Sequence, residues 1–252
     1  YINDTIFYVL TDGERNFKRG GLGLKGGMDY YINDKYTLSL SARTGNRGFE
    51  RNSTSKYHEY SDPISTDQWY YSSDMFEVDF DYYVINLDYQ MKFDQPGHEL
   101  LTSVYYRSRQ GINTNNMEED TTSIIELGTL SQRSRQEELG NEVRIKADYV
   151  KPLQNMGKIE AGYQARLDFR EADFIFEDYD YDQNEWFVNN DYTNQIEVSR
   201  NIQNIYGLFS SNLKGIDYQL GLRIEYTDRI IKQITTGDEY NFRKFMLFRT
   251  VH

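Results

Sequence analysis

The chain has 252 residues, of which 38% are hydrophobic, and its formal net charge is −12 at pH 7. Its 40 acidic against 28 basic residues argue against nucleic acid as a partner, because phosphate binding needs concentrated Lys and Arg. Mean hydropathy is −0.78 and no run of about 18 apolar residues occurs, which excludes a protein that crosses membranes by helices. The lack of cysteine excludes disulfides and thiolate metal sites.

Aromatic residues exclude a disordered acidic chain. The sequence holds 23 Tyr, 14 Phe and 2 Trp, too many for a segment that buries no surface. A transmembrane barrel remains compatible with the polar average, because only every second residue of a barrel strand needs to be apolar.

Alternation of apolar and polar residues is the dominant pattern along the chain. It begins after a short strand-like start at 5–10, runs weakly over 22–32, and is strict over 83–93, 143–149, 159–170 and 216–227. Such alternation predicts strands with one apolar and one polar face. We expect the polar face to line a barrel lumen, with these charged members: Asp88, Lys92, Arg144, Lys146, Arg166, Asp168, Arg223 and Glu225.

Connections of two kinds separate these strands. Short polar turns are predicted near 33–35, 94–98, 152–157 and 214–215, and long loops near 48–70, 112–135, 172–192 and 230–240. Short turns alternating with long loops are typical of outer-membrane barrels. We therefore predict an all-β fold: a single partial barrel domain over 1–252, forming an antiparallel transmembrane β-barrel wall of about ten long strands.

Two local features refine this prediction. Near Gln203 the apolar phase switches within 196–213, which indicates a β-bulge.

Tyr30, Tyr36, Tyr89 and Tyr149 lie beside predicted short turns, as expected for an aromatic girdle at a membrane interface. The alternative is that Tyr is simply a favourable strand residue.

Both ends of the sequence read as parts of strands. Tyr1 opens directly into strand-like sequence, and the chain stops at His252 in the middle of another predicted strand. We expect a piece of a larger barrel, whose leader was removed or precedes this segment.

The predicted loop at 177–186 holds candidate binding residues. Tyr179, Tyr181 and Trp186 are candidates for contact with a ligand outside the cell. Asp178, Asp180 and Asp182 have partial calcium-loop spacing. However, Gln183 and Asn189 stand where such a loop has Gly and Glu, so we predict that no metal ion binds there. We also predict no cofactor. The alternative to ligand contact is a loop that is simply solvated.

The remaining polar residues do not predict catalysis. The mixed-sign charges of the lumen face either neutralise one another or contact a plug or a polar solute. His58, His98 and His252 are scattered and are expected to be solvated. The sequence contains no catalytic triad order, zinc protease motif, phosphate loop or dinucleotide fingerprint, so we predict that the protein is not an enzyme.

Two hairpins resemble a known family. Residues 26–41, GGMDYYINDKYTLSLS, and 218–227, YQLGLRIEYT, resemble strands of the Bacteroidota outer-membrane β-barrel family, which is related to TonB-dependent receptors. The segment NIYG at 204–207 also fits. Residues 245–252 resemble the aromatic segment that follows, with Arg249 where the family usually has Pro.

The resemblance implies a location and a function. It implies a barrel of about 22 strands in the bacterial outer membrane, with an N-terminal plug and TonB-coupled uptake of a bulky or scarce nutrient. The expected partners are outer-membrane lipids, TonB through a plug domain, and a surface lipoprotein. Two alternatives remain open: a structural or anchoring barrel subunit of an outer-membrane complex, and a soluble secreted β-rich binding module.

Overall fold

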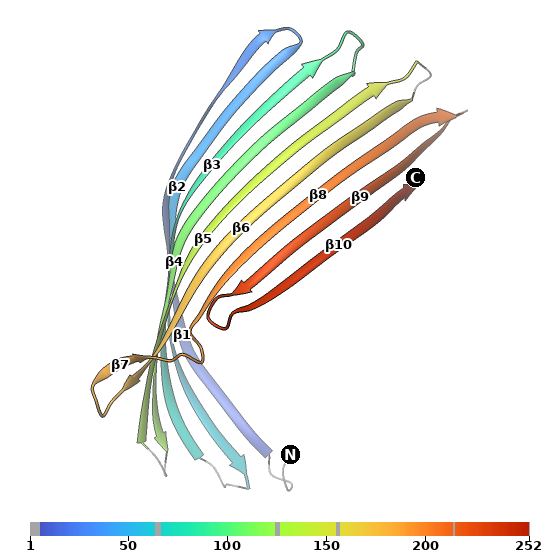
Figure 1. The fold of residues 1–252 in the computed structure, drawn as a ribbon. Coiled ribbons are helices and arrows are strands. Elements are labelled where there is room, and N and C mark those ends of the chain that lie inside the picture. The colour runs from blue at the N-terminus through green and yellow to red at the C-terminus, as the bar shows by residue number, and fades with distance from the viewer. Residues whose placement is uncertain (1–5, 64–66, 124–126, 155–156, 214, 252) are drawn as a thin grey trace.

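A computed structural model describes residues 6–63, 67–123, 127–154, 157–213 and 215–251 of the protein. They form one ten-stranded antiparallel sheet in the order β1-β2-β3-β4-β5-β6-β8-β9-β10 (Figure 1), and β7 pairs with β6 beside this path. Across these ranges, no helix is long and apolar enough to span a bilayer. The all-β antiparallel fold expected from the alternation is confirmed.

The strands are long and follow one another along the sheet. Their bounds are β1 Ile6–Asn33, β2 Tyr36–Asp62, β3 Asp67–Lys92, β4 Glu99–Ser123, β5 Leu127–Pro152, β6 Lys158–Asp180, β7 Glu185–Val188, β8 Asn194–Leu213, β9 Ile216–Gln233 and β10 Asp238–Val251. The nine long strands pair in sequence order, so that β6 is followed by β8 in the sheet. The short β7 folds back on the last residues of β6, beside the start of β8.

The connections lie at two opposite ends of the sheet. Those of β1–β2, β3–β4, β5–β6 and β8–β9 lie together at the upper end in Figure 1, at the positions where short turns were expected. Gly97 and Gly215 have φ of 77° and 85° in two of these turns, a left-handed conformation that favours glycine. Residues 155–156 and 214 of the expected turns lie outside the described residues.

The prediction of long irregular loops was wrong. β2 extends to Asp62 and β3 begins at Asp67, so most of 48–70 is strand, and the same holds for 112–135, 172–192 and 230–240. Residues 64–66 and 124–126 of those segments lie outside the described part. Alternation weakens there because the two faces exchange their polarity.

The expected bulge near Gln203 was also wrong. The pairing of β8 with β6 runs without a register shift from Asn194 to Ser210, and its pairing with β9 is equally continuous. The phase of the apolar residues therefore changes while the strand itself stays regular.

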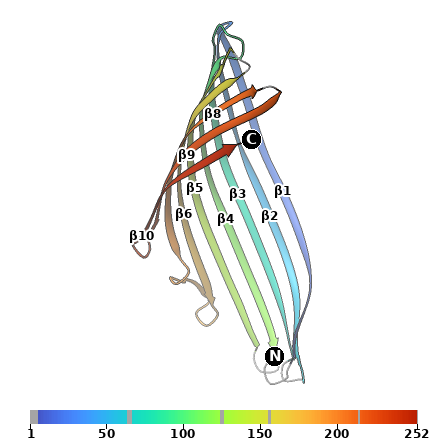
Figure 2. The same ribbon diagram turned by 90° about the vertical axis from the view of Figure 1, so that its right-hand side faces the viewer.

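The sheet is curved and twisted, so its two faces differ in crowding. In Figure 2, β8–β10 cross in front of the other strands at an angle, which shows the curl of the sheet. On β3, Tyr83 is 57% exposed and Leu87 39% exposed, whereas the even-numbered residues between and beside them are half-buried. Side chains crowd on a concave face and spread apart on a convex one. We call the face that carries Asp88 the inner face and the face that carries Leu87 the outer face.

The sheet has no second layer in its described part. Ala165 is the only buried hydrophobic residue in the described ranges, whereas large apolar side chains are exposed along every long strand. The sheet also has two edges, because β1 pairs only with β2 and β10 only with β9 in the described ranges. A soluble sheet would bury these apolar side chains against another layer, so they need an apolar solvent.

Candidate functional site

An apolar belt covers the outer face next to the short connections. There, each strand has a segment of about ten residues in which every second side chain is apolar. A tilted barrel strand needs a segment of this length to cross the hydrocarbon layer. The belt comprises Leu22, Leu24, Met28, Tyr30, Tyr36, Leu38, Leu40, Ala42, Tyr83, Ile85, Leu87, Tyr89, Met91, Leu100, Val104, Tyr106, Val143, Ile145, Ala147, Tyr149, Ile159, Ala161, Tyr163, Ala165, Leu167, Phe169, Ile205, Phe209, Ile216, Tyr218, Leu220, Leu222, Ile224, Tyr226, Phe245 and Leu247.

The strands continue well beyond this belt. After Tyr83, the outer face of β3 carries Asp81, Asp79 and Glu77, and every long strand becomes polar on its outer face in the same way. At about 3.3 Å per residue, the 26-residue β3 is about 85 Å long, against about 30 Å of hydrocarbon. More than half of β3 therefore projects into water.

Beyond the belt the inner face takes up the apolar residues. On β3 its members are Tyr82, Phe80, Val78 and Phe76. On β8, Ile202, Val198 and Ile196 lie on the inner face, while their neighbours on the outer face are polar. This exchange of polarity explains the phase switch that suggested a bulge.

The structure places all eight predicted lumen residues on the inner face. Directly opposite residues of paired strands share a face, and the register joins Asp88, Ser103, Lys146, Gln164, Asn204 and Glu225 in one row across six strands. Lys146 pairs with Asp148 at 2.6 Å, and Arg223 with Glu225 at 2.5 Å. Most of these charges thus have a neighbour of opposite sign.

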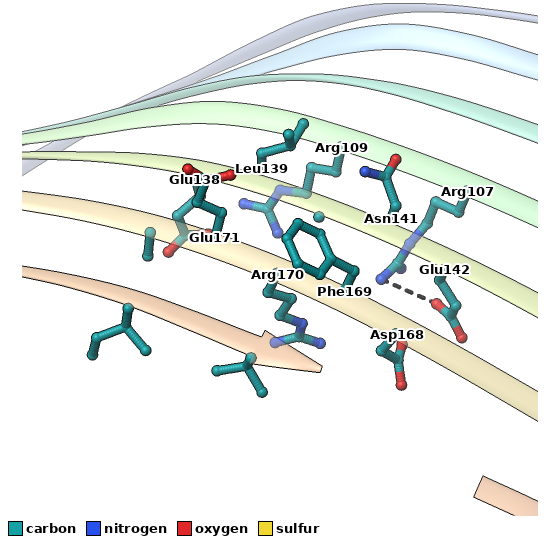
Figure 3. Close-up of a pocket in the computed structure, with 14 residues that line it drawn as sticks. Arg107, Arg109, Glu138, Leu139, Asn141, Glu142, Asp168, Phe169, Arg170 and Glu171 are labelled. Carbon is teal, nitrogen blue, oxygen red and sulfur yellow. Dashed lines mark ion pairs between the residues drawn. The ribbon is translucent and has the colours of Figure 1, made fainter. Parts of the chain in front are cut away.

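Glu142 is the centre of an ion network that the sequence did not single out. Its side chain is only 2% exposed and contacts three arginines: Arg107 at 3.3 Å, Arg166 at 3.0 Å, and Arg144. Asp168, directly opposite Glu142 in the same inner row, continues the network, because it accepts from Arg200 at 2.6 Å and from Arg166 at 3.2 Å. Figure 3 shows Glu142 and Asp168 side by side with Arg107 above them. These ion pairs compensate both buried carboxylates in this part of the inner face.

The predicted ligand residues form a cluster in the β6–β7 hairpin, at the end opposite the short turns. The rings of Tyr179 and Tyr181 are 4.9 Å apart, and those of Tyr179 and Trp186 are 5.1 Å apart. The guanidinium of Arg133 lies 4.4 Å from the Trp186 ring. The register places this cluster on the outer face, so it is separated from the inner-face charges.

An ion pair supports this hairpin. Arg133 donates to Glu177 at 2.5 and 3.0 Å, and this hydrogen bond holds the pKa of Glu177 below its usual 4.5. Glu177 lies beyond the belt on β6, whose last belt residue is Phe169.

The three alternate aspartates do not converge as metal ligands. Asp178 accepts from Gln132 at 2.8 Å and from Asn189 at 2.6 Å, whereas Asp180 caps the turn through the backbone N–H groups of Asp182 and Gln183. Within the described ranges, no group of three His, Cys, Asp or Glu side chains is placed to hold a metal ion.

The expectation of solvated histidines was wrong for two of the three. His58 stacks on Trp69 with ring centroids 3.9 Å apart, and His98 stacks on Phe93 at the same distance and contacts the Tyr149 hydroxyl at 2.8 Å. His252 lies outside the described residues.

A cationic region of the inner face was missed by the sequence reading. The register brings together inner positions of 15–25, 43–53, 74–84 and 107–117 on β1–β4. These positions hold eight cations against the single carboxylate of Asp74: Arg15, Arg19, Lys25, Arg43, Arg47, Arg51, Arg107 and Arg109. Arginine recurring at every fourth residue from 43 to 51 was the available signal, but it crosses the boundary of the loop expected at 48–70.

Aromatic rings and glycines organise this region. Tyr82 lies over Gly45, where an added Cβ would be 2.9 Å from its hydroxyl, and the guanidiniums of Arg43 and Arg47 lie 5.4 and 6.0 Å from its ring. The Arg109 guanidinium lies 4.1 Å from the Phe80 ring. We call Arg43, Arg47, Arg109 and Arg170, with the rings of Tyr82 and Phe80, the arginine–aromatic patch.

Comparison with known proteins gives one family match. The model of the outer membrane protein beta-barrel family matches residues 91–252. No curated protein matches the sequence.

Three solved structures that are similar to this chain share little of its sequence. The unliganded ferric citrate transporter FecA is 8% identical with a TM-score of 0.37, over 92% of this chain and 41% of FecA. The ferric preacinetobactin receptor BauA of Acinetobacter baumannii is 9% identical with a TM-score of 0.47, over 97% and 44%. The siderophore receptor PiuA of Acinetobacter baumannii is 7% identical with a TM-score of 0.40, over 96% and 45%.

The chain thus spans less than half the length of each of these proteins. The family match covers more than half of the chain, and it agrees with the apolar belt on the outer face and the charged inner face. The protein is therefore located in the outer membrane, and the chain belongs to the outer membrane protein beta-barrel family.

Proposed function

We propose that the protein is the barrel wall of an outer-membrane receptor that takes up a bulky or scarce nutrient with energy supplied through TonB. The observation that carries this proposal is the length of the strands beyond the belt. They support a tall vestibule whose inner face carries charged and aromatic side chains on the side opposite the short turns, which face the periplasm in such barrels. A vestibule of this kind suits capture of a large solute before transport.

The partners follow from the same proposal. TonB would act through a plug domain, and a surface lipoprotein would meet the projecting strand ends. The likeness of 26–41 and 218–227 to family hairpins supports an origin in Bacteroidota. In this proposal the role is not catalytic: Glu142 and Asp168, the most buried carboxylates in the described ranges, are each held by at least two arginines.

Gene deletion in the native host tests the receptor function. A deletion strain would be grown on single limiting nutrients together with a strain depleted of TonB. We expect both strains to lose growth on the same nutrient, and the full-length gene to restore it. A variant with Leu87→Arg and Leu222→Arg should not restore growth, because both substitutions place a charge in the belt.

A structural or anchoring subunit is the competing function, and the ion network around Glu142 on the inner face favours it. Ion pairs of that kind also suit a wall packed against another polypeptide. Purification of native outer-membrane complexes from the deletion strain separates the two functions. Loss of a complex with nutrient uptake unchanged would replace the receptor proposal by the anchoring one.

A further inference from the structure

We infer that the arginine–aromatic patch is a binding site for an extended solute that carries several oxyanions, such as carboxylates, sulfates or phosphates. This inference rests on the proposed function in one respect only, namely that a solute reaches the inner face from the side beyond the belt. It names the chemical class of that solute.

The first support is a contrast within one face of the sheet. Around Glu142, four arginines surround two buried carboxylates, and Arg223 has Glu225. By contrast, Arg43, Arg47, Arg109 and Arg170 form no ion pair in the described part of the protein. Like charges on neighbouring strands destabilise a sheet. Because none of these four arginines pairs with a carboxylate in the described residues, neutralisation of the wall does not explain them.

The second support is the convergence of side chains over glycine. The register places Gly45, Tyr82, Arg109, Gly140 and Arg170 in one inner row. Arg109 and Arg170 flank Gly140 in this row, and a Cβ added at Gly140 would lie 3.9 Å from Arg170 Cγ. A hollow of about 280 Å³ lies there.

The third support is an unused donor at this hollow. Arg109 Nε is buried and has no hydrogen-bond partner in the described structure. Four carboxylates also border the hollow: Glu138, Glu142, Asp168 and Glu171. Glu142 and Asp168 are already paired with arginines, and Glu138 accepts a hydrogen bond from Gln136 at 2.9 Å, so none of them pairs with Arg109 or Arg170 in the described residues. A donor of this kind is costly unless something accepts from it.

The stacked rings prepare the arginines for oxyanions. A guanidinium that lies on an aromatic ring is held in one plane, and the N–H groups at its edge remain free to donate in pairs to a carboxylate, sulfate or phosphate. From β2 to β6 the patch crosses four inter-strand steps of about 4.8 Å, or about 19 Å. One small anion reaches only part of this width, whereas an oligomeric anion reaches all of it.

The position favours a solute over an acidic segment of the protein itself. The patch begins where the belt ends and continues away from the short turns. The chain as a whole carries −12, so its general field repels polyanions. A local concentration of arginine then gives the inner face a region that attracts them.

Equilibrium binding by the full-length protein in detergent micelles tests the site. The probes are fluorescent oligogalacturonate, a sulfated dextran oligomer and linear polyphosphate, with a neutral maltooligosaccharide as reference. We expect at least one polyanion to bind more tightly than the neutral sugar, with an affinity that falls as salt rises. The three probes distinguish carboxylate, sulfate and phosphate as the preferred group.

Variants localise the binding. Arg43→Gln, Arg47→Gln and Arg109→Gln together should weaken polyanion binding about 10- to 100-fold. The corresponding lysine variants should retain part of it, because charge stays and the planar fork is lost. Arg223→Gln, in the neutralised region, is the matched control and should bind like wild type.

Three results would overturn the inference. The first is that the neutral sugar binds as tightly as the polyanions, and the second is that the triple glutamine variant binds with wild-type affinity. The third is that no probe binds, which is expected if an acidic segment of the protein covers the patch. The assay requires no transport, so its failure leaves the uptake experiment untouched. Conversely, if the growth experiment showed no dependence on TonB, equilibrium binding of the polyanions would be unaffected.

Discussion

Leu87 and Asp88 are consecutive residues of β3, yet they meet different solvents. Leu87 lies on the outer face in a row of apolar side chains with Leu40, Val104 and Ile145. Asp88 lies on the inner face between Ser39 and Ser103 and accepts from Asn86. The same substitution at these two positions therefore separates the two faces.

Leu87→Arg should destabilise the folded protein by about 2–4 kcal/mol, because it moves a charge towards the middle of the hydrocarbon layer. Asp88→Arg should cost much less, since the inner face is polar. Reversible urea unfolding in lipid vesicles measures both free energies. Equal costs for the two variants would contradict the assignment of the faces.

Gly162 and Tyr206 are paired across β6 and β8 and share space on the inner face. The Tyr206 ring lies where a Cβ of residue 162 would be, and its hydroxyl donates to Asp148 at 2.6 Å. Gly162→Ala should therefore destabilise the protein by about 1–3 kcal/mol through overpacking.

The double variant Gly162→Ala, Tyr206→Ser is the control for this prediction. The double variant should lose less unfolding free energy than the two single variants lose together, because the ring that collides with the new methyl group is gone. Strict additivity would show that ring and methyl group do not compete.

At the scale of elements, the β6–β7 hairpin is held by an ion pair that acid should remove. The folded-state pKa of Glu177 is lowered by Arg133, so the pair contributes its full stabilisation above the ordinary pKa of 4.5. That contribution is lost as the pH falls through the lowered pKa. We expect the hairpin to loosen below about pH 4.5 while the sheet remains folded.

Trp186 fluorescence in a Trp69→Phe background reports this change, because the Arg133 guanidinium lies over the Trp186 ring. Glu177→Gln should abolish the acid transition and give the loosened signal at every pH. A transition that persists unchanged in Glu177→Gln would assign it to another group.

Each long strand behaves as two elements joined end to end. On β3, the segment from Tyr83 to Met91 alternates with its apolar side outward, and the segment from Phe76 to Tyr82 alternates with its apolar side inward. Alternation of constant phase predicts the first segment as a strand within 83–93. It makes no prediction for 76–82, because the phase change interrupts the pattern there.

At the scale of the whole molecule, the two edges of the sheet pass through the belt. In the described residues, β1 and β10 each have one unpaired side, and hydrocarbon does not tolerate unpaired backbone groups. In the membrane, both edges must therefore pair with further strands or with each other.

Hydrogen exchange of the intact protein in lipid nanodiscs tests this requirement. Amides of 22–30 in β1 and of 245–249 in β10 should exchange as slowly as amides of 143–149 in β5, which has a partner on both sides. The backbone amides of Thr235 and Thr236 in the β9–β10 turn are the fast-exchanging reference, since the amides of Ile234 and Gly237 donate hydrogen bonds. Edge amides as fast as the turn would mean that the edges are unpaired in the membrane.

The sequence by itself determined the class of fold, the faces of the strands next to the short turns, and the positions of those turns, because all three follow from local alternation and turn residues. Only the tertiary structure decided the rest. Glu142 acquires Arg107 and Arg166, and Tyr82, Arg109 and Arg170 acquire their common row, from residues that are dozens of positions apart. Pairing register sets these contacts, and register depends on how whole strands align rather than on the pattern within any one of them.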